Sequence, residues 1–350
     1  MQSTWMLYAP LTALFTSLLA VEALRIRARH LGLLDRPDQR KRHVGAVPLV
    51  GGIAIYLGVL LGAWCVPELT QFSKALLCGA GVMVLLGTLD DRLGLSVRSR
   101  LLVQTVTVLA IIAATGVYVR SFGVIDGVDM QLGWIGVPVT VIAMIGLLNA
   151  FNLVDGIDGL AGGLALVAIG AILLFRRVPV DYDVPVLLLL MGAALLPYLA
   201  TNLGLFGRKI FLGDAGSLLL GFVIGWALIR SSESVPTGMT PADVLWCVAV
   251  PVLDTLAVMV HRMRSGRSPF SPDRGHIHHR LLESGLGPRT TLVALLLTAI
   301  VLAAVGALVH QFGQAASLIV FGVLTVIHIV ATGRFAQALA ALPQQPPSRG

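Results

Sequence analysis

Residues 133–175 read GWIGVPVTVIAMIGLLNAFNLVDGIDGLAGGLALVAIGAILLF, two apolar runs joined by a short polar segment. Each run approaches the roughly 20 apolar residues that a helix needs to cross a bilayer. The joining segment holds two asparagines and two aspartates, and no lysine or arginine. Because acidic residues this close to apolar spans are costly, they indicate a functional site in a polytopic membrane protein.

The composition of the whole chain agrees with this interpretation. Of its 350 residues, 56% are hydrophobic and only 12% are charged, about half the charged share of an ordinary soluble domain. So few charges cannot cover the surface of a soluble protein of this length. The composition therefore excludes a cytosolic globular protein, a disordered chain and a nucleic-acid-binding module.

Apolar stretches recur along the chain and predict an all-α polytopic membrane protein with about eleven transmembrane helices. We expect the spans at about residues 5–24, 47–66, 72–89, 101–119, 133–150, 159–175, 184–201, 213–229, 243–261, 290–310 and 314–332. They form a single integral membrane domain over residues 1–335. Residues 336–350 are expected to form a disordered cytoplasmic tail.

Eleven spans place the two termini on opposite sides, and the lysines and arginines choose the orientation. With the N-terminus outside, 20 of the 25 lysines and arginines fall in inside segments and 5 in outside segments. This bias predicts an outside N-terminus and a cytoplasmic C-terminus. The inside loops are also the longer ones, so we expect the active site at the cytoplasmic face.

Acidic side chains gather at the predicted inner ends of the helices. Asp90 and Asp91 close the third span, where they oppose the negative end of the helix dipole. Such a pair is unfavourable for the helix and well suited to binding a cation. The alternative interpretation is a solvated helix terminus followed by Arg92.

Two further segments add oxygen ligands. Asn149 and Asn152 are three residues apart, as are Asp155 and Asp158, so each pair shares a face wherever the chain is helical. The alternative here is an ordinary Asx/Gly turn. The segment FLGDAGS, residues 211–217, enters the eighth span. Its Asp214 suits an N-cap as well as a site, and an aromatic side chain beside it could face a nucleobase.

These oxygen-rich side chains favour a hard cation. Mg²⁺ typically takes one or two carboxylates together with substrate phosphates and water. We therefore expect Mg²⁺, with Mn²⁺ as the alternative ion. The histidines lie in basic surroundings instead of forming a zinc cluster.

Basic side chains concentrate in two inside loops. The first, residues 35–52, contains Arg42 and His43, and the second, residues 262–280, contains a His-x-His-His cluster. Positive-inside topology and anionic lipid headgroups account for part of this charge. The cluster could bind a transition metal, but the arginines beside it favour phosphate contacts.

Asp254 is an acidic residue well inside a predicted span. Asp254 is about two turns from the inner end of the ninth span, a depth at which an ionisable group has a functional or paired role by default. We expect Arg262 or Arg264 to be its partner.

Carboxylates for Mg²⁺ and cations for phosphates on one membrane face predict phosphoryl transfer between a cytosolic polyphosphate and a lipid. A transporter is the alternative from another class. Transporters usually show repeat symmetry and broken helices, and the sequence predicts neither. A scaffold protein would not require uncompensated carboxylates.

Five motifs occur in one order, GAVPLVGG (45–52), LDD (89–91), NAFNLVDGIDGL (149–160), FLGDAGS (211–217) and HIHH (276–279). They resemble those of the polyprenyl-phosphate N-acetylhexosamine-1-phosphate transferases, glycosyltransferase family 4. The WecA/TagO type is closer than the MraY type, which carries a Pro-led histidine run. The resemblance covers about residues 30 to 285.

The resemblance implies that undecaprenyl phosphate attacks UDP-N-acetylglucosamine, giving undecaprenyl-diphospho-N-acetylglucosamine and UMP. Another UDP-N-acetyl sugar, or the UDP-MurNAc-pentapeptide of the MraY type, is the alternative donor. The glycan made could be O-antigen, enterobacterial common antigen, teichoic acid or another polymer of the cell envelope. The resemblance places the protein in the bacterial cytoplasmic membrane and is compatible with a homodimer.

The resemblance also implies roles for individual residues. The expected catalytic and metal-binding residues are Asp90, Asp91 and Asp214. The expected nucleotide-sugar ligands are Phe211, Asn149, Asn152, Asp155, Asp158, Arg264, His276, His278 and His279. The expected contacts of the lipid phosphate are Arg42, His43 and Arg98.

Overall fold

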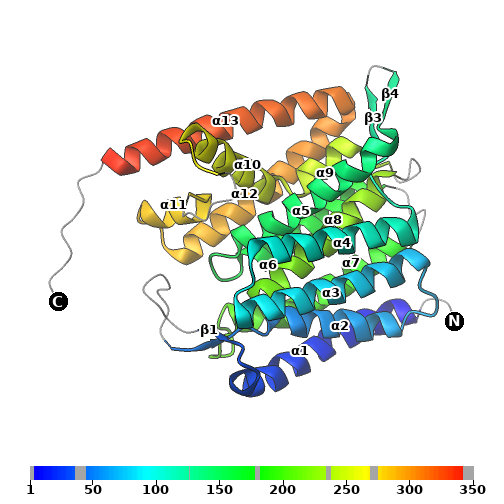
Figure 1. The fold of residues 1–350 in the computed structure, drawn as a ribbon, viewed down its shortest axis with the longest axis vertical. Coiled ribbons are helices and arrows are strands. Elements are labelled where there is room, and N and C mark those ends of the chain that lie inside the picture. Colours follow the sequence, from blue (N-terminus) through cyan, green and yellow to red (C-terminus); the bar gives the residue numbers. More distant parts are fainter. Residues whose placement is uncertain are drawn as a thin grey trace.

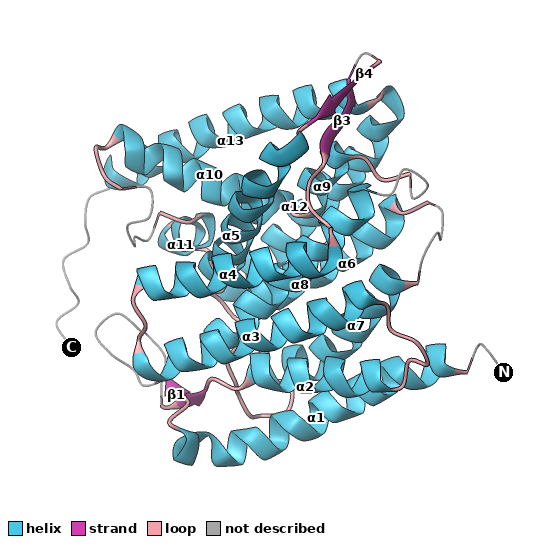
Figure 2. Ribbon diagram, turned by 45° about the vertical axis from the view of Figure 1, so that its right-hand side comes forward, coloured by secondary structure: helices cyan, strands magenta, loops and turns pink. Residues whose placement is uncertain are grey.

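The computed structural model describes residues 4–35, 45–125, 127–177, 182–233, 238–268 and 275–341. Helices make up most of this part of the chain and strands very little of it (Figure 2), which confirms the all-α class. The α-helices are α1 (Trp5–Leu31), α2 (Gly51–Trp64), α3 (Gln71–Leu93), α4 (Val97–Thr115), α5 (Gly136–Val154), α6 (Leu160–Phe175), α7 (Asp183–Asn202), α8 (Gly213–Glu233), α9 (Pro241–Cys247), α10 (Ala249–Arg264), α11 (Ile277–Glu283), α12 (Pro288–Val309) and α13 (Gln314–Ala341). The shorter elements are the strands β1 (Leu34–Asp35), β2 (Val47–Pro48), β3 (Ser121–Ile125) and β4 (Val128–Gln131) and the 3-10 helices η1 (Gly133–Ile135) and η3 (His310–Phe312).

Helix α8 forms the centre of the fold. In its most apolar stretch 89% of the residues are buried, against 22% in α1 and 17% in α13. Helices α2, α3 and α5 pack against it. A helix that is apolar on every face needs such surroundings, so the composition of α8 explains its central position.

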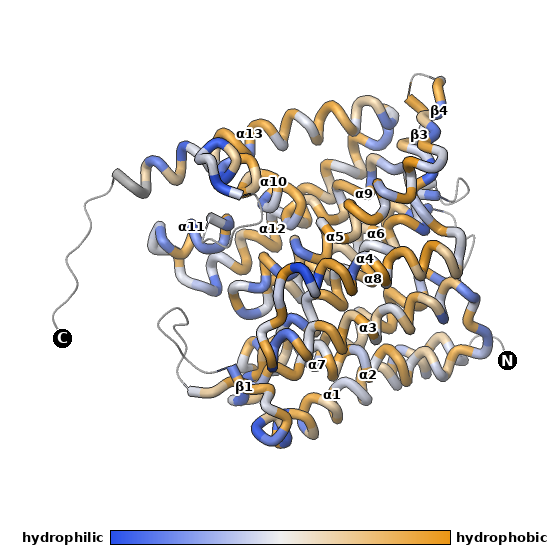
Figure 3. The backbone as a smooth tube through the Cα atoms, in the orientation of Figure 1, coloured by the Kyte–Doolittle hydropathy of each residue, from blue (hydrophilic) through white to orange (hydrophobic). Residues whose placement is uncertain are grey.

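The peripheral helices expose large apolar side chains. Leu19 on α1, Ile142 on α5 and Ile319 on α13 are each about 70% exposed. Hydrophobic residues line the middle of the helices, and hydrophilic ones gather at their ends (Figure 3). Such a surface matches lipid and not water. Eight helices in the described residues are long and apolar enough to cross a membrane, which confirms a polytopic membrane protein.

The predicted span at 243–261 is not one continuous helix. Helices α9 and α10 meet at Val248 with a bend of 86°, so this segment is a broken span or a re-entrant loop. Pro251 explains the position of the break, because it has no N–H to donate to the carbonyl of Cys247 four residues earlier. Helices α2 and α6 are apolar but shorter than the other spans.

The helices run side by side, so their connections gather at two ends of the molecule (Figure 1). One end, here called the site end, carries the β1–β2 pair, α11 and the last turns of α13. The opposite end carries the start of α1 and the β3–β4 hairpin, which the sequence did not predict, and is here called the hairpin end.

The last helix is longer than predicted. Helix α13 continues to Ala341, beyond residue 335, where the membrane domain was expected to end. The rest of the predicted tail, residues 342–350, lies outside the described residues.

Candidate active site

The start of α8 is joined to the start of α2 by backbone hydrogen bonds. The amide of Phe211 donates to the carbonyl of Pro48 at 2.8 Å. The amides of Gly51 and Gly52 donate to the carbonyls of Phe211 and Leu212, each at 3.0 Å. Two of the five sequence motifs, far apart in the chain, are therefore held together as one backbone ladder.

Helix α8 also begins within backbone contact of two neighbouring helices. A Cβ atom on Gly52 of α2 would lie 2.1 Å from the amide nitrogen of Gly216, and one on Gly87 of α3 would lie 2.3 Å from that of Ala215. Side chains do not tolerate such distances, so only glycine permits this packing. The close approach brings Asp214 to the end of α3.

Asp91 caps α8 from the neighbouring helix. Its Oδ1 atom accepts the N–H of Asp214 at 3.0 Å, and its Oδ2 atom accepts that of Ala215 at 3.4 Å. The first amides of a helix lack partners within the helix and attract negative charge, so a carboxylate there is stabilising. Gly213 precedes them with a φ of 71°. Asp91 thus has a structural role that its sequence position did not reveal.

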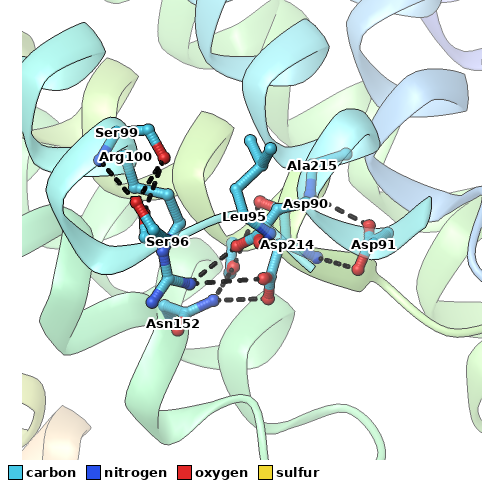
Figure 4. Close-up of polar contacts among 10 residues, drawn as sticks. Asp90, Asp91, Leu95, Ser96, Ser99, Arg100, Asn152, Asp214 and Ala215 are labelled. Atoms are coloured by element: carbon cyan, nitrogen blue, oxygen red, sulfur yellow. Dashed lines mark hydrogen bonds and ion pairs between the residues drawn. The ribbon is translucent and has the colours of Figure 1, made fainter. Parts of the chain in front are cut away.

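Asp90 and Asp214 converge on one guanidinium group (Figure 4). Asp90 is buried and accepts hydrogen bonds from the amide of Leu95 and from Arg100, both at 2.7 Å. The same nitrogen of Arg100 lies 3.7 Å from Oδ2 of Asp214. Asn152 donates to Oδ1 of Asp214 at 2.7 Å. About a third of the Asp214 side chain is exposed, so it is open to a ligand.

The hinge between α5 and α6 is fixed beside these carboxylates. Asn202 accepts the N–H of Gly159 at 2.6 Å and donates to the carbonyl of Ile210 at 2.8 Å. Asp158 forms an ion pair with Lys209 at 2.7 Å. The polar segment that joins α5 to α6 is therefore held against the segment that leads into α8.

Asp155 in this hinge is held close to neutrality. Burial, together with the negative charges of Asp214, Asp91 and Asp158, raises its pKa from 3.8 to about 8. Carboxylates that repel one another in this way disfavour the ionised form. A cation bound among them would relieve the repulsion.

Helix α11 covers the same hinge with its histidines. A Cβ atom on Gly156 would lie 2.0 Å from Nε2 of His278, so the ring rests on the glycine backbone. His278 is fully buried, and its ring centroid lies 4.1 Å from that of His279. Burial, reinforced by the charge of His279, lowers the pKa of His278 to about 3. The centre of the predicted anion site is thus a neutral ring.

Two of the predicted nucleotide-sugar ligands have other contacts in the structure. The side chain of Asn149 donates to the carbonyl of Ile145 on its own helix at 2.7 Å. The ring of Phe211 lies 5.0 Å from the ammonium group of Lys209, a cation–π contact.

The arginine at the carboxylates was not among the predicted site residues. The sequence predicts Arg98 as a phosphate ligand, but Arg98 is exposed and Arg100 reaches the carboxylates. Two residues that are two positions apart on a helix point in nearly opposite directions, about 200° around its axis. Choosing between Arg98 and Arg100 therefore requires knowing which face of α4 is turned to the carboxylates. Arg264 is exposed. The predicted ligands Arg42 and His43 lie outside the described residues.

The donor set fits a divalent cation that is shared with a substrate. Within the described ranges, no group of three or more His, Cys, Asp or Glu side chains could hold an ion unaided. Mg²⁺ rarely needs one, because substrate phosphates and water supply its other ligands. Asp214 is partly exposed and Asp155 carries unrelieved repulsion, so these two could hold the ion while Asp90 and Asp91 keep their hydrogen bonds.

The fold and the site together define a class: a polytopic membrane protein with an acidic site at the ends of its helices, suited to a divalent cation and phosphate esters. The profile of a family described as glycosyl transferase family 4 matches residues 73–232. The chain belongs to this family, because it is also 37–40% identical to relatives over more than three quarters of both chains.

Three relatives carry the same name, undecaprenyl-phosphate alpha-N-acetylglucosaminyl 1-phosphate transferase. The chain is 40% identical to that of Escherichia coli (strain K12) over 298 residues, 84% of this chain and 81% of the relative. It is 40% identical to that of Yersinia pestis over 279 residues, 79% and 76% of the two chains. It is 37% identical to that of Haemophilus influenzae over 319 residues, 89% of each chain. The family resemblance predicted from the motifs is confirmed.

The raised pKa of Asp155 predicts a pH-dependent stability of the metal-free protein. Between pH 3.8 and about 8 the folded state holds a proton that the unfolded state releases, so the stability falls as the pH rises through this range. Asp155→Asn removes this part of the fall. We measure the melting temperature in detergent and chelator as the pH is raised from about 4 to about 8. Over this range it should drop by a few degrees more in the unsubstituted protein than in the variant. Parallel curves would contradict the assignment.

Proposed function

We propose that this protein transfers N-acetylglucosamine 1-phosphate from UDP-N-acetylglucosamine to undecaprenyl phosphate. The products are undecaprenyl-diphospho-N-acetylglucosamine and UMP. The observation that carries the proposal is the convergence of Asp90, Asp214 and Arg100 from three helices. The names of the relatives, which match most of the chain, support the choice of substrates.

The reaction exchanges one phosphorus–oxygen bond for another. An oxygen of undecaprenyl phosphate attacks the β-phosphorus of the donor, and the bond from that phosphorus to the oxygen bridging the two phosphates breaks. UMP leaves with the electron pair. The nucleophile is already an anion at neutral pH, so no base has to remove a proton from it. The difficulty is to bring two anions together.

The side chains at the site end address this repulsion. Arg100 supplies a fixed positive charge between Asp90 and Asp214, and we assign it to a phosphate oxygen of the substrates. Mg²⁺, for which Mn²⁺ is the alternative, would neutralise phosphate charge when bound at Asp214 and Asp155. Asp91 holds the start of α8, and with it Asp214, in place.

The remaining side chains are assigned to the two substrates. We assign the uracil ring to Phe211, with Asn152 and Asp158 nearby. The sugar and diphosphate are assigned to the histidines of α11. Arg264 and Asn149 complete the expected donor ligands, and Arg42, His43 and Arg98 remain the expected contacts of the lipid phosphate.

We infer eleven spans with the N-terminus outside the bacterial cytoplasmic membrane. Eight long helices, the bent pair α9–α10 and the two shorter helices α2 and α6 account for this number. The start of α1 and the end of α13 lie at opposite ends of the molecule (Figure 1), as an odd number requires. The distribution of lysine and arginine favours a cytoplasmic site end. A homodimer remains compatible with this arrangement.

The function is tested by UMP release from purified protein with undecaprenyl phosphate and a panel of UDP-sugars, with and without Mg²⁺. We expect turnover with UDP-N-acetylglucosamine and Mg²⁺ only. Asp214→Asn should reduce it by about 10²–10³-fold, because one fixed charge at the reacting phosphates is lost. Asp129→Asn, in the β3–β4 hairpin at the opposite end, is the matched control and should retain full turnover. Equal rates in the two variants would refute the site.

The orientation is tested by cysteine labelling in a variant without native cysteines. Val128→Cys, exposed in the hairpin, should react with an impermeant thiol reagent added to intact cells. Ser271→Cys, between α10 and α11 in the sequence, should react only after the membrane is opened. The reverse pattern would overturn the proposed topology.

A further inference from the structure

A buried aspartate–histidine pair lies behind the site, between α10 and α11. Oδ2 of Asp254 is 2.8 Å from Nδ1 of His276, and the two side chains are 2% and 3% exposed. The other oxygen, Oδ1, accepts the N–H of Ile277 at 2.8 Å. One carboxylate therefore binds both the ring that precedes α11 and the first amide of the helix. Neither contact was predicted from the sequence.

This contact fixes the ring of His276 as well as its position. An ionised carboxylate can only accept hydrogen bonds, so the proton of the ring must sit on Nδ1. Its Nε2 atom is buried and has no hydrogen-bond partner among the described residues. The same is true of both ring nitrogens of His278. Buried polar atoms without partners suggest a place for a ligand.

The two histidines connect this pair to the acidic hinge. The rings of His276 and His278 are nearly parallel, with centroids 6.1 Å apart. The ring of His278 rests against Gly156, between Asp155 and Asp158. The start of α11 therefore contacts Asp254 on one side and the segment between α5 and α6 on the other.

We propose that Asp254 is a positioning residue for the nucleotide-sugar donor. It fixes the tautomer of His276 and the first turn of α11, and thereby holds the His278 ring over the hinge that lines the donor site. This inference rests on the proposed function, because it assigns the hinge to the donor. Asp254 touches neither substrate and acts through α11.

The test compares Asp254→Asn with the unsubstituted protein in UMP release. Asparagine keeps an acceptor for Ile277 but presents its NH₂ group to Nδ1 of His276, which then has to give up its proton. We expect kcat/KM for UDP-N-acetylglucosamine to fall about 10–100-fold, the loss typical of residues that orient a metal-binding histidine. The KM for the donor should rise, and the KM for undecaprenyl phosphate should not change.

A second variant covers the case in which Asp254→Asn does not fold. His276→Asn keeps a buried donor for Asp254 and removes the rest of the ring, and we expect a similar rise in the donor KM. Where both single variants fold, the double variant should lose no more than either single one, because Asp254 acts through His276. Additive losses would overturn the inference.

A matched control separates positioning from stability. Asp243 is fully buried and lies 3.0 Å from Nδ1 of His310, on α9 at the start of the broken span. Asp243→Asn should lower the melting temperature as much as Asp254→Asn and leave both KM values unchanged. An unchanged donor KM in Asp254→Asn would refute the positioning role while the proposed function stands. No turnover by the unsubstituted protein with any UDP-sugar would refute both.

Discussion

The candidate site depends on the close approach of the first turn of α8 to α2 and α3. Gly52 and Gly87 leave no room for a Cβ atom at these contacts. The distance is short because backbone packs on backbone, and Asp91 then reaches the free amides of α8 from the end of α3. Asp214 is brought to Asp90 and Arg100 as a consequence of this packing. A site built on rigid helix ends holds its groups more firmly than one built on loops.

Charge balance explains why these residues are useful together. Asp91, Asp158 and Asp214 lie near Asp155, and their negative charges add to the effect of burial in raising its pKa. Arg100 compensates part of this charge. A divalent cation that arrives with a phosphate ester would compensate more, so substrate and ion stabilise each other at the site. A lipid-borne anion and a cytosolic anion could then approach each other closely, which is the physical requirement of phosphoryl transfer.

Much of this arrangement could be predicted from the sequence. The apolar runs give the helices, and the aspartates, asparagines and histidines at their ends indicate the chemistry, because these residue types are costly near lipid. What the sequence does not reveal depends on three-dimensional packing. The rotation of α4 about its axis turns Arg100, and not Arg98, toward the carboxylates. Asp91 can cap α8 only because α8 begins beside the end of α3.

The missed features follow the same pattern. The break at Val248 depends on Pro251, which has no N–H to donate to the helix. The apolar residues on both sides of it still predict a continuous helix, so the sequence does not reveal the break. The sequence predicts Arg262 or Arg264 as the partner of Asp254, because residues on the same helix are the ones that a sequence pattern can place near it. The structure instead places His276, the residue before α11, against Asp254.

The central claim is tested most directly by Gly87→Ala, which adds one methyl group where α3 touches the first turn of α8. The new Cβ atom would lie 2.3 Å from the amide nitrogen of Ala215, so the turn that carries Asp214 has to move. A displacement of about 1 Å can cost roughly 10²-fold in rate, and we predict a loss of that size in kcat/KM with the protein still inserted in the membrane. Gly146→Ala on α5, where a Cβ atom meets nothing within 4 Å, should retain full activity. Full activity in Gly87→Ala would contradict the account.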